Sequence, residues 1–170
     1  LRKDATPRTC REPPQYDIAE KSKSQRKGAL AVQGTQTASA PRKVAIVGGG
    51  PTRRKAPFND PTWEIWGFSS RKWRYPRISR WFELHHLTDL RQQLAVRKAR
   101  RRTFKGYMRF MRRLRCPVYM AKKHPKIPQS VTFPVKRLVK EFGRCFTSTA
   151  SYMVALAISE GYDVIGLWGI

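Results

Sequence analysis

The sequence predicts an α/β fold of the Rossmann-like type, in which helices flank a mostly parallel sheet. Short apolar runs alternate with helical segments along the chain from residue 43. The first run, Val44–Val47, is apolar at every position, which is typical of a parallel strand buried on both faces. The hydrophobic fraction of 40% in 170 residues is enough for a core. Alternation of this kind implies right-handed crossovers between parallel strands.

The predicted strands are bounded by turn residues. Val44–Val47 ends in three glycines, and Trp63–Phe68 follows the turn sequence Asn59-Asp60-Pro61. Arg80–Leu84 is the third predicted strand, and His85 and His86 come directly after it. Two further strands are predicted at Pro117–Met120 and Val164–Trp168, and the last of these is expected to be buried.

The predicted helices begin and end at recognisable capping residues. Thr88 is the expected N-cap of a helix from residue 89 toward residue 102, and Gly106 is expected to interrupt the helical pattern before Tyr107–Leu114. Pro134 is expected to open a helix that stops near Phe142, before Gly143. The clearest helix covers residues 148–160 and ends at Gly161, with a buried face containing Met153, Ala157 and Ile158.

Composition divides the chain into two parts. Residues 1–42 are rich in Pro, Ser, Thr, Gln, Lys and Arg without a sustained period, which predicts a disordered basic tail. Residues 43–170 then form the Rossmann-like domain. Because the chain begins with Leu1 and stops at Ile170, directly after an expected buried strand, we expect a fragment with an incomplete domain. The alternative is a natural C-terminal strand.

Composition also limits the classes of function. No apolar run approaches the roughly 18 residues of a membrane helix, so a membrane partner is not expected. The three cysteines are widely spaced, which predicts neither a disulfide framework nor a metal site and favours a cytoplasmic setting. The formal charge of +25 makes a polyanionic partner a natural candidate.

The first candidate site is the turn Gly48-Gly49-Gly50-Pro51-Thr52. Glycines after a first strand allow backbone amides to approach a phosphate closely. A dinucleotide fingerprint would need another glycine at Arg53 and an acidic residue after the second strand, where the chain has Ser69. The pattern therefore indicates a nucleotide-type phosphate site, or simply a tight turn.

Hydroxyl side chains gather at the start of the clearest helix. Ser148 or Thr149 is expected to cap it, and Thr147 and Ser151 lie beside them. Four hydroxyls exceed what a cap needs, so they can also bind a phosphate or a sugar hydroxyl. His85 and His86, at the end of a strand, are candidates for a general acid or base or for a phosphate contact. The alternative for the histidines is solvated loop positions.

The strongest charge concentration lies between Arg91 and Arg115, where 11 Lys and Arg residues occur without an acid. Nucleic-acid phosphates attract such stretches, and Arg100, Arg101 and Arg102 are the predicted contacts. A second interpretation is an amphipathic helix whose charged side chains form its solvent-exposed face. Its buried stripe would contain the apolar residues Leu94, Phe104, Met108, Met111 and Leu114.

The chain from Lys43 to Ile170 resembles short, uncharacterised Rossmann-like proteins of phage type. The segment from Phe146 to Gly169 is also similar to the bacterial sialyltransferase family and its motility-associated glycosyltransferase relatives. The further matching pieces are Val44–Gly48 with Pro51-Thr52, Trp63–Gly67, Trp81–His85 and Pro117–Met120.

The resemblance implies a nucleotide-sugar site made by the glycine turn and by a Thr-Ser pair at the helix start. It carries these roles onto the residues Gly48, Gly50, Pro51, Thr52, Ser148 and Thr149. The family has Asn where this chain has Gly49 and Ser69, and its catalytic His would lie beyond Ile170. No catalytic base is therefore assigned, and His85 does not match the family's histidine.

The functional expectation is a nucleotide or nucleotide-sugar binding domain, glycosyltransferase-like if active, with a nucleotide sugar as substrate and no certain cofactor. The alternatives are a protein that binds nucleic acid through charge alone, without sequence preference, and a catalytically inactive interaction module.

Overall fold

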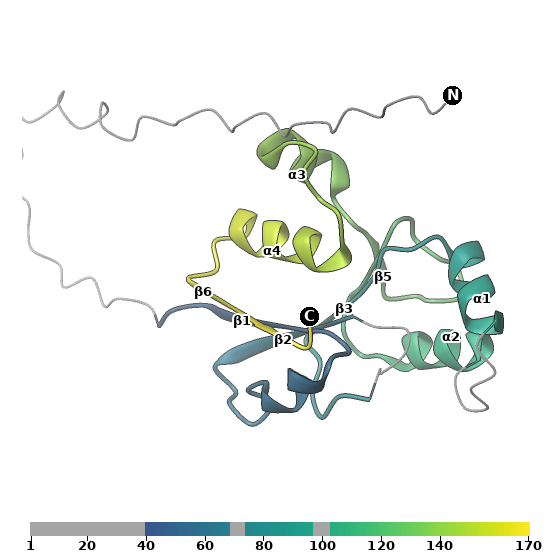
Figure 1. Cartoon of the computed structure of the whole chain (residues 1–170), viewed down its shortest axis with the longest axis horizontal. Helices are drawn as coiled ribbons and strands as arrows, with labels where there is room; N and C mark the ends of the chain where they lie inside the picture. The colour runs from purple at the N-terminus through teal and green to yellow at the C-terminus, as the bar shows by residue number, and fades with distance from the viewer. Residues whose placement is uncertain (1–39, 69–73, 97–102) are drawn as a thin grey trace, which may run out of the picture. The chain divides into compact units, whose positions relative to one another are not determined.

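The fold is built on a six-stranded sheet in which every neighbouring pair is parallel, in the order β5-β4-β3-β2-β1-β6 (Figure 1). The computed structural model describes residues 40–68, 74–96 and 103–170. The strands are β1 (Lys43–Val47), β2 (Trp63–Phe68), β3 (Arg80–Glu83), β4 (Val118–Met120), β5 (Ser130–Thr132) and β6 (Val164–Trp168). The helices are α1 (Leu87–Val96), α2 (Phe104–Arg113), α3 (Val135–Phe142) and α4 (Thr149–Ser159), with a 3₁₀ helix, η1, at Pro51–Lys55. The predicted α/β class with a parallel sheet is confirmed.

Both faces of the sheet are covered. Val44 and Ile46 of β1 pack in one apolar cluster with α3 and α4, whereas Ala45 and Val47 pack in another on the opposite face. A third cluster joins Trp81 to α1 and α2. Successive strand residues point to opposite faces, so a central strand covered on both sides must be apolar throughout. This explains the continuous apolar run at the first predicted strand.

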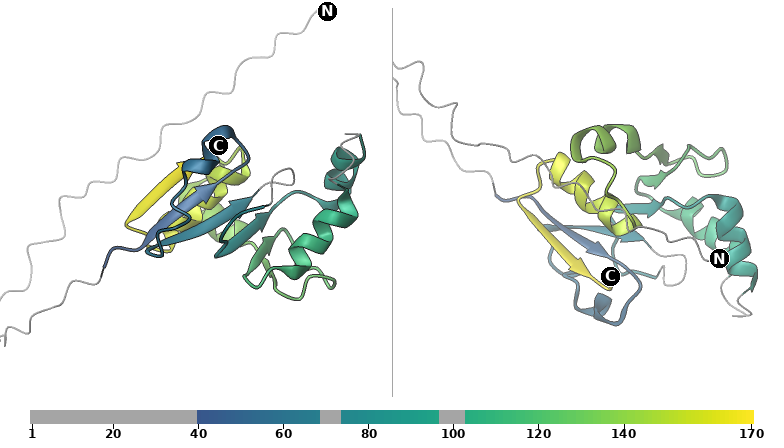
Figure 2. Two further views of the ribbon diagram at one scale, coloured as in Figure 1. Left: turned by 90° about the horizontal axis from the view of Figure 1, so that it is seen from below. Right: turned by 45° about the horizontal axis from the view of Figure 1, so that its top comes forward.

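Strand β1 marks the point where the chain changes direction across the sheet. It pairs with β2 on one side and with β6 on the other. The strands β2 to β5 follow outward in sequence on the first side, and the chain then returns through α3 and α4 to place β6 on the second. Figure 2 shows β1 and β6 side by side with their arrowheads in the same direction. This arrangement is the topological switch point at which open α/β sheets place ligands.

Two predictions about helix starts were wrong. Helix α1 begins at Leu87, so Thr88 lies inside it, and the Leu90 amide donates to the carbonyl of His86. Gly106 does not interrupt a helix but lies in the first turn of α2, where its amide donates to Oγ1 of the N-cap Thr103 at 3.1 Å. Glycine costs most stability in the interior of a helix, and Gly106 lies near the N-terminal end of α2. The part of the predicted helix beyond residue 96 lies outside the described residues.

The sheet edges also differ from expectation. Strand β6 is an edge strand rather than a buried one, with Val164 39% and Leu167 53% exposed. Strand β5, at the other edge, was not predicted, because its three residues include two exposed ones and no apolar run. In α4, Met153 and Ala157 are buried as predicted, but Ile158 is 53% exposed because it lies a further 100° around the helix.

A polar network at the amino ends of the strands joins β2, β3 and the end of α4. Arg80 forms ion pairs with Glu160 at 2.7 Å and with Glu64 at 3.3 Å, and it donates to the hydroxyl of Tyr162 at 3.1 Å. Arg42 donates through its amide to Asp163 and through its guanidinium to the carbonyl of Glu160. The last residue of the predicted tail therefore contacts the domain, whereas residues 1–39 lie outside the described part.

The helices of the described residues are all too short or too polar to cross a membrane.

Candidate functional site

The candidate site is the edge of the sheet at which the strands end. All six strands are parallel, so the loops that follow them lie along this one edge. Helix α4 leads back to the start of β6, which places its N-terminus at the same edge. The structure thus brings three predicted groups to the carboxyl edge: the glycine turn, the two histidines and the hydroxyls of Ser148 and Thr149.

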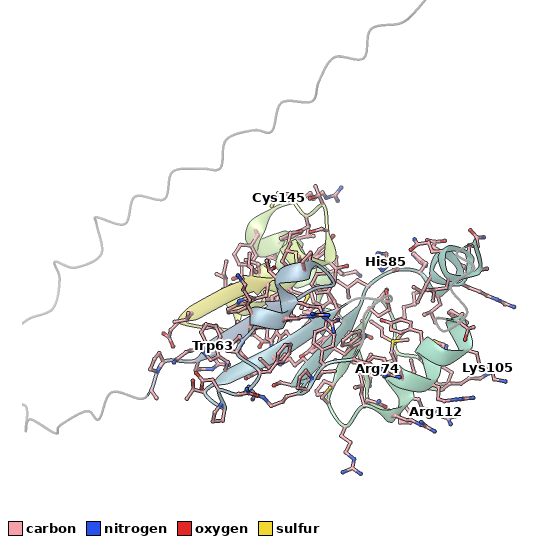
Figure 3. The ribbon with its side chains drawn as sticks, turned by 60° about the horizontal axis from the view of Figure 1, so that its bottom comes forward. Trp63, Arg74, His85, Lys105, Arg112 and Cys145 are labelled. Atoms are coloured by element: carbon pink, nitrogen blue, oxygen red, sulfur yellow. The ribbon has the colours of Figure 1, made fainter. Side chains whose placement is uncertain are left out.

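The strongest chemical feature at this edge is a pair formed by Glu83 and His85. The Nδ1 atom of His85 lies 2.7 Å from Oε1 of Glu83, and the backbone amide of His85 donates to the same oxygen at 3.1 Å. The side chain of Glu83 is 2% exposed, whereas that of His85 is 54% exposed. A buried carboxylate therefore fixes one nitrogen of an imidazole that is otherwise open to solvent. His85 is labelled in Figure 3.

Two buried aromatic side chains hold Glu83 from the other side. The Tyr107 hydroxyl donates to Oε2 of Glu83 at 2.8 Å, and the indole N–H of Trp81 donates to the Tyr107 oxygen at 3.0 Å. The result is a continuous chain of hydrogen bonds from Trp81 through Tyr107 and Glu83 to His85. Burying a carboxylate is costly unless it is hydrogen-bonded, and here both oxygens have donors.

Hydrogen bonding and burial in this chain shift the pKa values of His85 and Tyr107. The hydrogen bond to Glu83 raises the pKa of His85 above its ordinary value of 6.5, and partial burial opposes this shift. Burial, supported by the adjacent Glu83, raises the pKa of Tyr107 well above its ordinary value of 10.0. Tyr107 thus remains a neutral donor, and Glu83 orients the imidazole so that its Nδ1 carries a proton and its Nε2 faces outward.

The glycine turn is closed onto the end of β6. The amide of Gly48 donates to the carbonyl of Trp168 and that of Gly50 to the carbonyl of Gly169, both at 2.8 Å. The amide of Gly169 in turn donates to Oγ1 of Thr52 at 2.8 Å. A Cβ on Gly48 would lie 2.3 Å from the Gly169 oxygen, so this close backbone crossing requires glycine.

These bonds divide the residues of the turn that were predicted to contact a phosphate into two groups, those whose amides are already used and those whose amides are available. The amides of Gly48 and Gly50 are already used, and Pro51 has no amide hydrogen. The amides of Gly49 and Thr52 have no acceptor among the described residues and remain available to a ligand. The turn lies at the switch point between β1 and β6, as the phosphate-site prediction requires.

The hydroxyls at α4 divide in a similar way. Oγ of Ser148 accepts from the amide of Ser151 at 3.2 Å, and Oγ of Ser151 accepts from the amide of Ser148 at 3.1 Å. This reciprocal capping box uses both serines. The Thr147 and Thr149 hydroxyls have no hydrogen-bond partner among the described residues, so these two are available for binding.

The remaining predicted residues contribute less to the site. His86 is exposed, and only its carbonyl is used, at the start of α1. Ser69, Arg100, Arg101 and Arg102 lie outside the described residues. Within the described ranges, no three His, Cys, Asp or Glu side chains are grouped as a metal ion would require.

Sequence reasoning missed Glu83, Tyr107 and Trp81. The spacing of Glu83 and His85 is a usable signal, because residues two apart near the end of a strand point to the same face. Tyr107 gives no such signal, because it comes from a helix 24 residues away in the chain.

Comparison of the chain with protein-family models, curated proteins and solved structures gives no match. Any functional conclusion therefore depends on the geometry of the described residues.

Proposed function

We propose that this chain binds a nucleotide or nucleotide sugar at the carboxyl edge of its sheet, and that His85 acts there as the acid or base of a glycosyltransferase-like reaction. The observation that carries the proposal is the contact of 2.7 Å between the buried carboxylate of Glu83 and the half-exposed imidazole of His85. A catalytic histidine needs an orienting group at one nitrogen and access to substrate at the other.

The placement of the pair supports a catalytic role over a purely structural one. A buried carboxylate that served only stability could be replaced by an apolar residue at little cost. Here the carboxylate has Tyr107 on one oxygen and, on the other, a half-exposed imidazole that it orients. The imidazole itself contributes little packing, because more than half of its surface is exposed.

The proposed ligand follows from the groups available along the same edge. The free amides of Gly49 and Thr52 are donors suited to phosphate oxygens, and they lie at the topological switch point. The Thr149 hydroxyl begins α4, where the helix dipole also favours an anion. Donors from the glycine turn and from α4 would hold a phosphate, and His85 would face the group transferred.

In the proposed reaction, Nε2 of His85 takes the proton of an acceptor hydroxyl. The hydroxyl oxygen forms a bond to the anomeric carbon of the donor sugar, and the bond from that carbon to the phosphate oxygen breaks. The phosphate leaves with the electron pair, and the backbone amides donate to its added negative charge. Glu83 stabilises the imidazolium that results.

The test measures the rate at which CMP- and UDP-activated sugars are hydrolysed, with water as acceptor. The released nucleotide is the product that is quantified. His85→Gln should lower the rate by about 100-fold or more, the usual contribution of a general base. Glu83→Gln should lower it less, because the imidazole keeps its position through weaker bonds. His86→Gln is the matched control and should leave the rate unchanged.

Equal rates for the parent and His85→Gln would contradict the assignment of the base. If the parent neither hydrolyses these donors nor binds their nucleotides by calorimetry, the proposed function is rejected as a whole.

A further inference from the structure

A second feature lies on the sheet face opposite α4, where an open pocket of about 480 Å³ separates segment 74–78 from α2. Its walls carry three arginines, Arg74 from the segment and Arg109 and Arg113 from the helix. Two aromatic rings, those of Tyr75 and Phe110, also line it. The volume is in the range of pockets that hold a small organic ligand.

No acidic side chain of the described residues neutralises the positive charge of this pocket. Arg109 and Arg113 are one helical turn apart and therefore lie on the same side of α2. Among the residues that the structure describes, no acidic residue lines the pocket, and α2 contains none. None of the three guanidinium groups forms an ion pair with another described residue. By contrast, Arg80 at the amino ends of the strands has two carboxylate partners. An anionic ligand would relieve the repulsion among the three pocket arginines.

The aromatic rings of the pocket are held in fixed positions by Trp81. The Trp81 ring is buried and makes edge contacts with Tyr75 and Phe110, with centroids 5.5 Å and 5.0 Å apart. Tyr75 is also anchored through its hydroxyl, which lies 2.9 Å from the carbonyl oxygens of Val47 and Gly48. Rings fixed in this way lose little freedom when a flat ligand contacts them.

We propose that this pocket binds single-stranded nucleic acid, with phosphates on Arg74, Arg109 and Arg113 and a base against the aromatic rings. A basic groove with aromatic side chains is the usual means of binding single strands without sequence preference. A duplex presents its phosphates on a convex surface and keeps its bases stacked inside, so it would leave the aromatic wall of a hollow unused. The site differs from the carboxyl edge and does not depend on the function proposed there.

The test exploits two pairs of basic residues on the same helix. Arg109 and Arg113 line the pocket, whereas Lys105 and Arg112 are exposed on α2 and do not. In Figure 3, Lys105 and Arg112 project from α2 toward solvent, and Arg74 lies beside the helix. The double variants Arg109→Gln/Arg113→Gln and Lys105→Gln/Arg112→Gln remove the same charge, and Gln is a good helix former. Both keep the remaining basic residues of the full chain.

Binding is measured by fluorescence anisotropy with a labelled 12-nucleotide oligo(dT) at several salt concentrations. The pocket variant should bind about tenfold or more weakly, and its slope of log affinity against log salt should be less steep by about 1.4, from 0.7 for each lost phosphate contact. The Lys105/Arg112 control should stay within about twofold of the parent, since neither residue would touch a phosphate. Circular dichroism verifies that both variants keep the helical content of the parent.

The outcomes separate the pocket from a general charge effect. A loss in the pocket variant at least about threefold greater than that in the control supports the proposal, and a smaller difference overturns it. Failure of the parent to bind oligo(dT) at low salt also overturns it. If a duplex of the same length binds more tightly than the single strand, the three arginines bind duplex phosphates and the proposal is overturned. Uridine monophosphate should bind the pocket more weakly than the oligonucleotide does. If the two affinities per site are equal, the ligand of the pocket is a free nucleotide and the proposal of single-stranded nucleic acid is overturned.

Discussion

At the scale of single residues, His85 combines an exposed ring with a buried partner. Its pKa is raised because its Nδ1–H bond to Glu83 is stronger when the imidazole is charged. In the unfolded chain this bond is absent, and the pKa returns toward 6.5. The pair therefore contributes its full stabilisation when the pH is below the pKa that His85 has in the unfolded chain. This contribution is lost as the pH rises through the pKa that His85 has in the folded protein.

We therefore expect the free energy of unfolding to fall as the pH is raised through the interval above 6.5. His85→Gln should remove this part of the pH dependence, because Gln does not titrate. The measurement is urea denaturation of both proteins from about pH 5.5 to about pH 8.5. His86→Gln serves as the control, since its side chain has no partner among the described residues. Parallel curves for the parent and His85→Gln would show that the bond to Glu83 contributes no pH-dependent stability.

The residues of this site show how far sequence reasoning reaches. His85 was predicted as a candidate because it follows a strand, and the ends of parallel strands are ligand positions. Its partner was missed because a glutamate within an apolar strand gives no pattern of its own. Only the fold brings Tyr107 and Trp81 to Glu83 and so accounts for a carboxylate that is 2% exposed.

At the scale of elements, the hydroxyls at the start of α4 fall into two groups, those used in the cap and those without a partner among the described residues. Ser148 and Ser151 form the capping box, whereas Thr147 is exposed and Thr149 is half-buried, both without a hydrogen-bond partner among the described residues. The sequence predicted the cap and the excess of hydroxyls, but it could not tell which hydroxyls were in use.

Replacing Ser148 by Ala should lower the free energy of unfolding by about 1 kcal/mol, because the bond from the Ser151 amide to Oγ of Ser148 is lost. Thr147→Ala is the matched control and should change it by less than about 0.5 kcal/mol. Thermal or urea unfolding of both variants measures the difference. If the two changes are equal, Ser148 does not act as the cap of α4 in solution.

Prediction of the strands succeeded where the apolar pattern is strong, and at the sheet edges it missed β5 and the exposure of β6. The strands β1 and β2 have their predicted positions, because residues buried on both faces or packed by aromatics leave a strong apolar pattern. Strand β5 and the exposed character of β6 were missed, because an edge strand needs few apolar residues. The contact between the glycine turn and the end of β6 could not be predicted either, because it depends on the order of the strands in the sheet. A local sequence pattern does not reveal that order.

At the scale of the whole domain, the parallel sheet separates stabilising contacts from proposed chemistry. The Arg80 network ties together the amino ends of the strands, and the available amides, hydroxyls and imidazole lie at the carboxyl ends. The basic pocket lies on the face covered by α2, although Tyr75 connects it to the carbonyl of Gly48. Charge alone therefore does not locate the nucleotide site, and the two regions must be tested separately.

The central claim is that a nucleotide binds at the carboxyl edge within reach of His85. The most direct measurement is a titration of the ¹⁵N-labelled full chain with CMP and UMP, in which backbone amides and the imidazole nitrogens of His85 are followed by NMR. We predict that the signals of Gly49, Thr52, Thr149 and the Nε2 atom of His85 shift together along one binding curve. Unchanged signals at these four positions under nucleotide saturation, or shifts confined to α2, would contradict the claim.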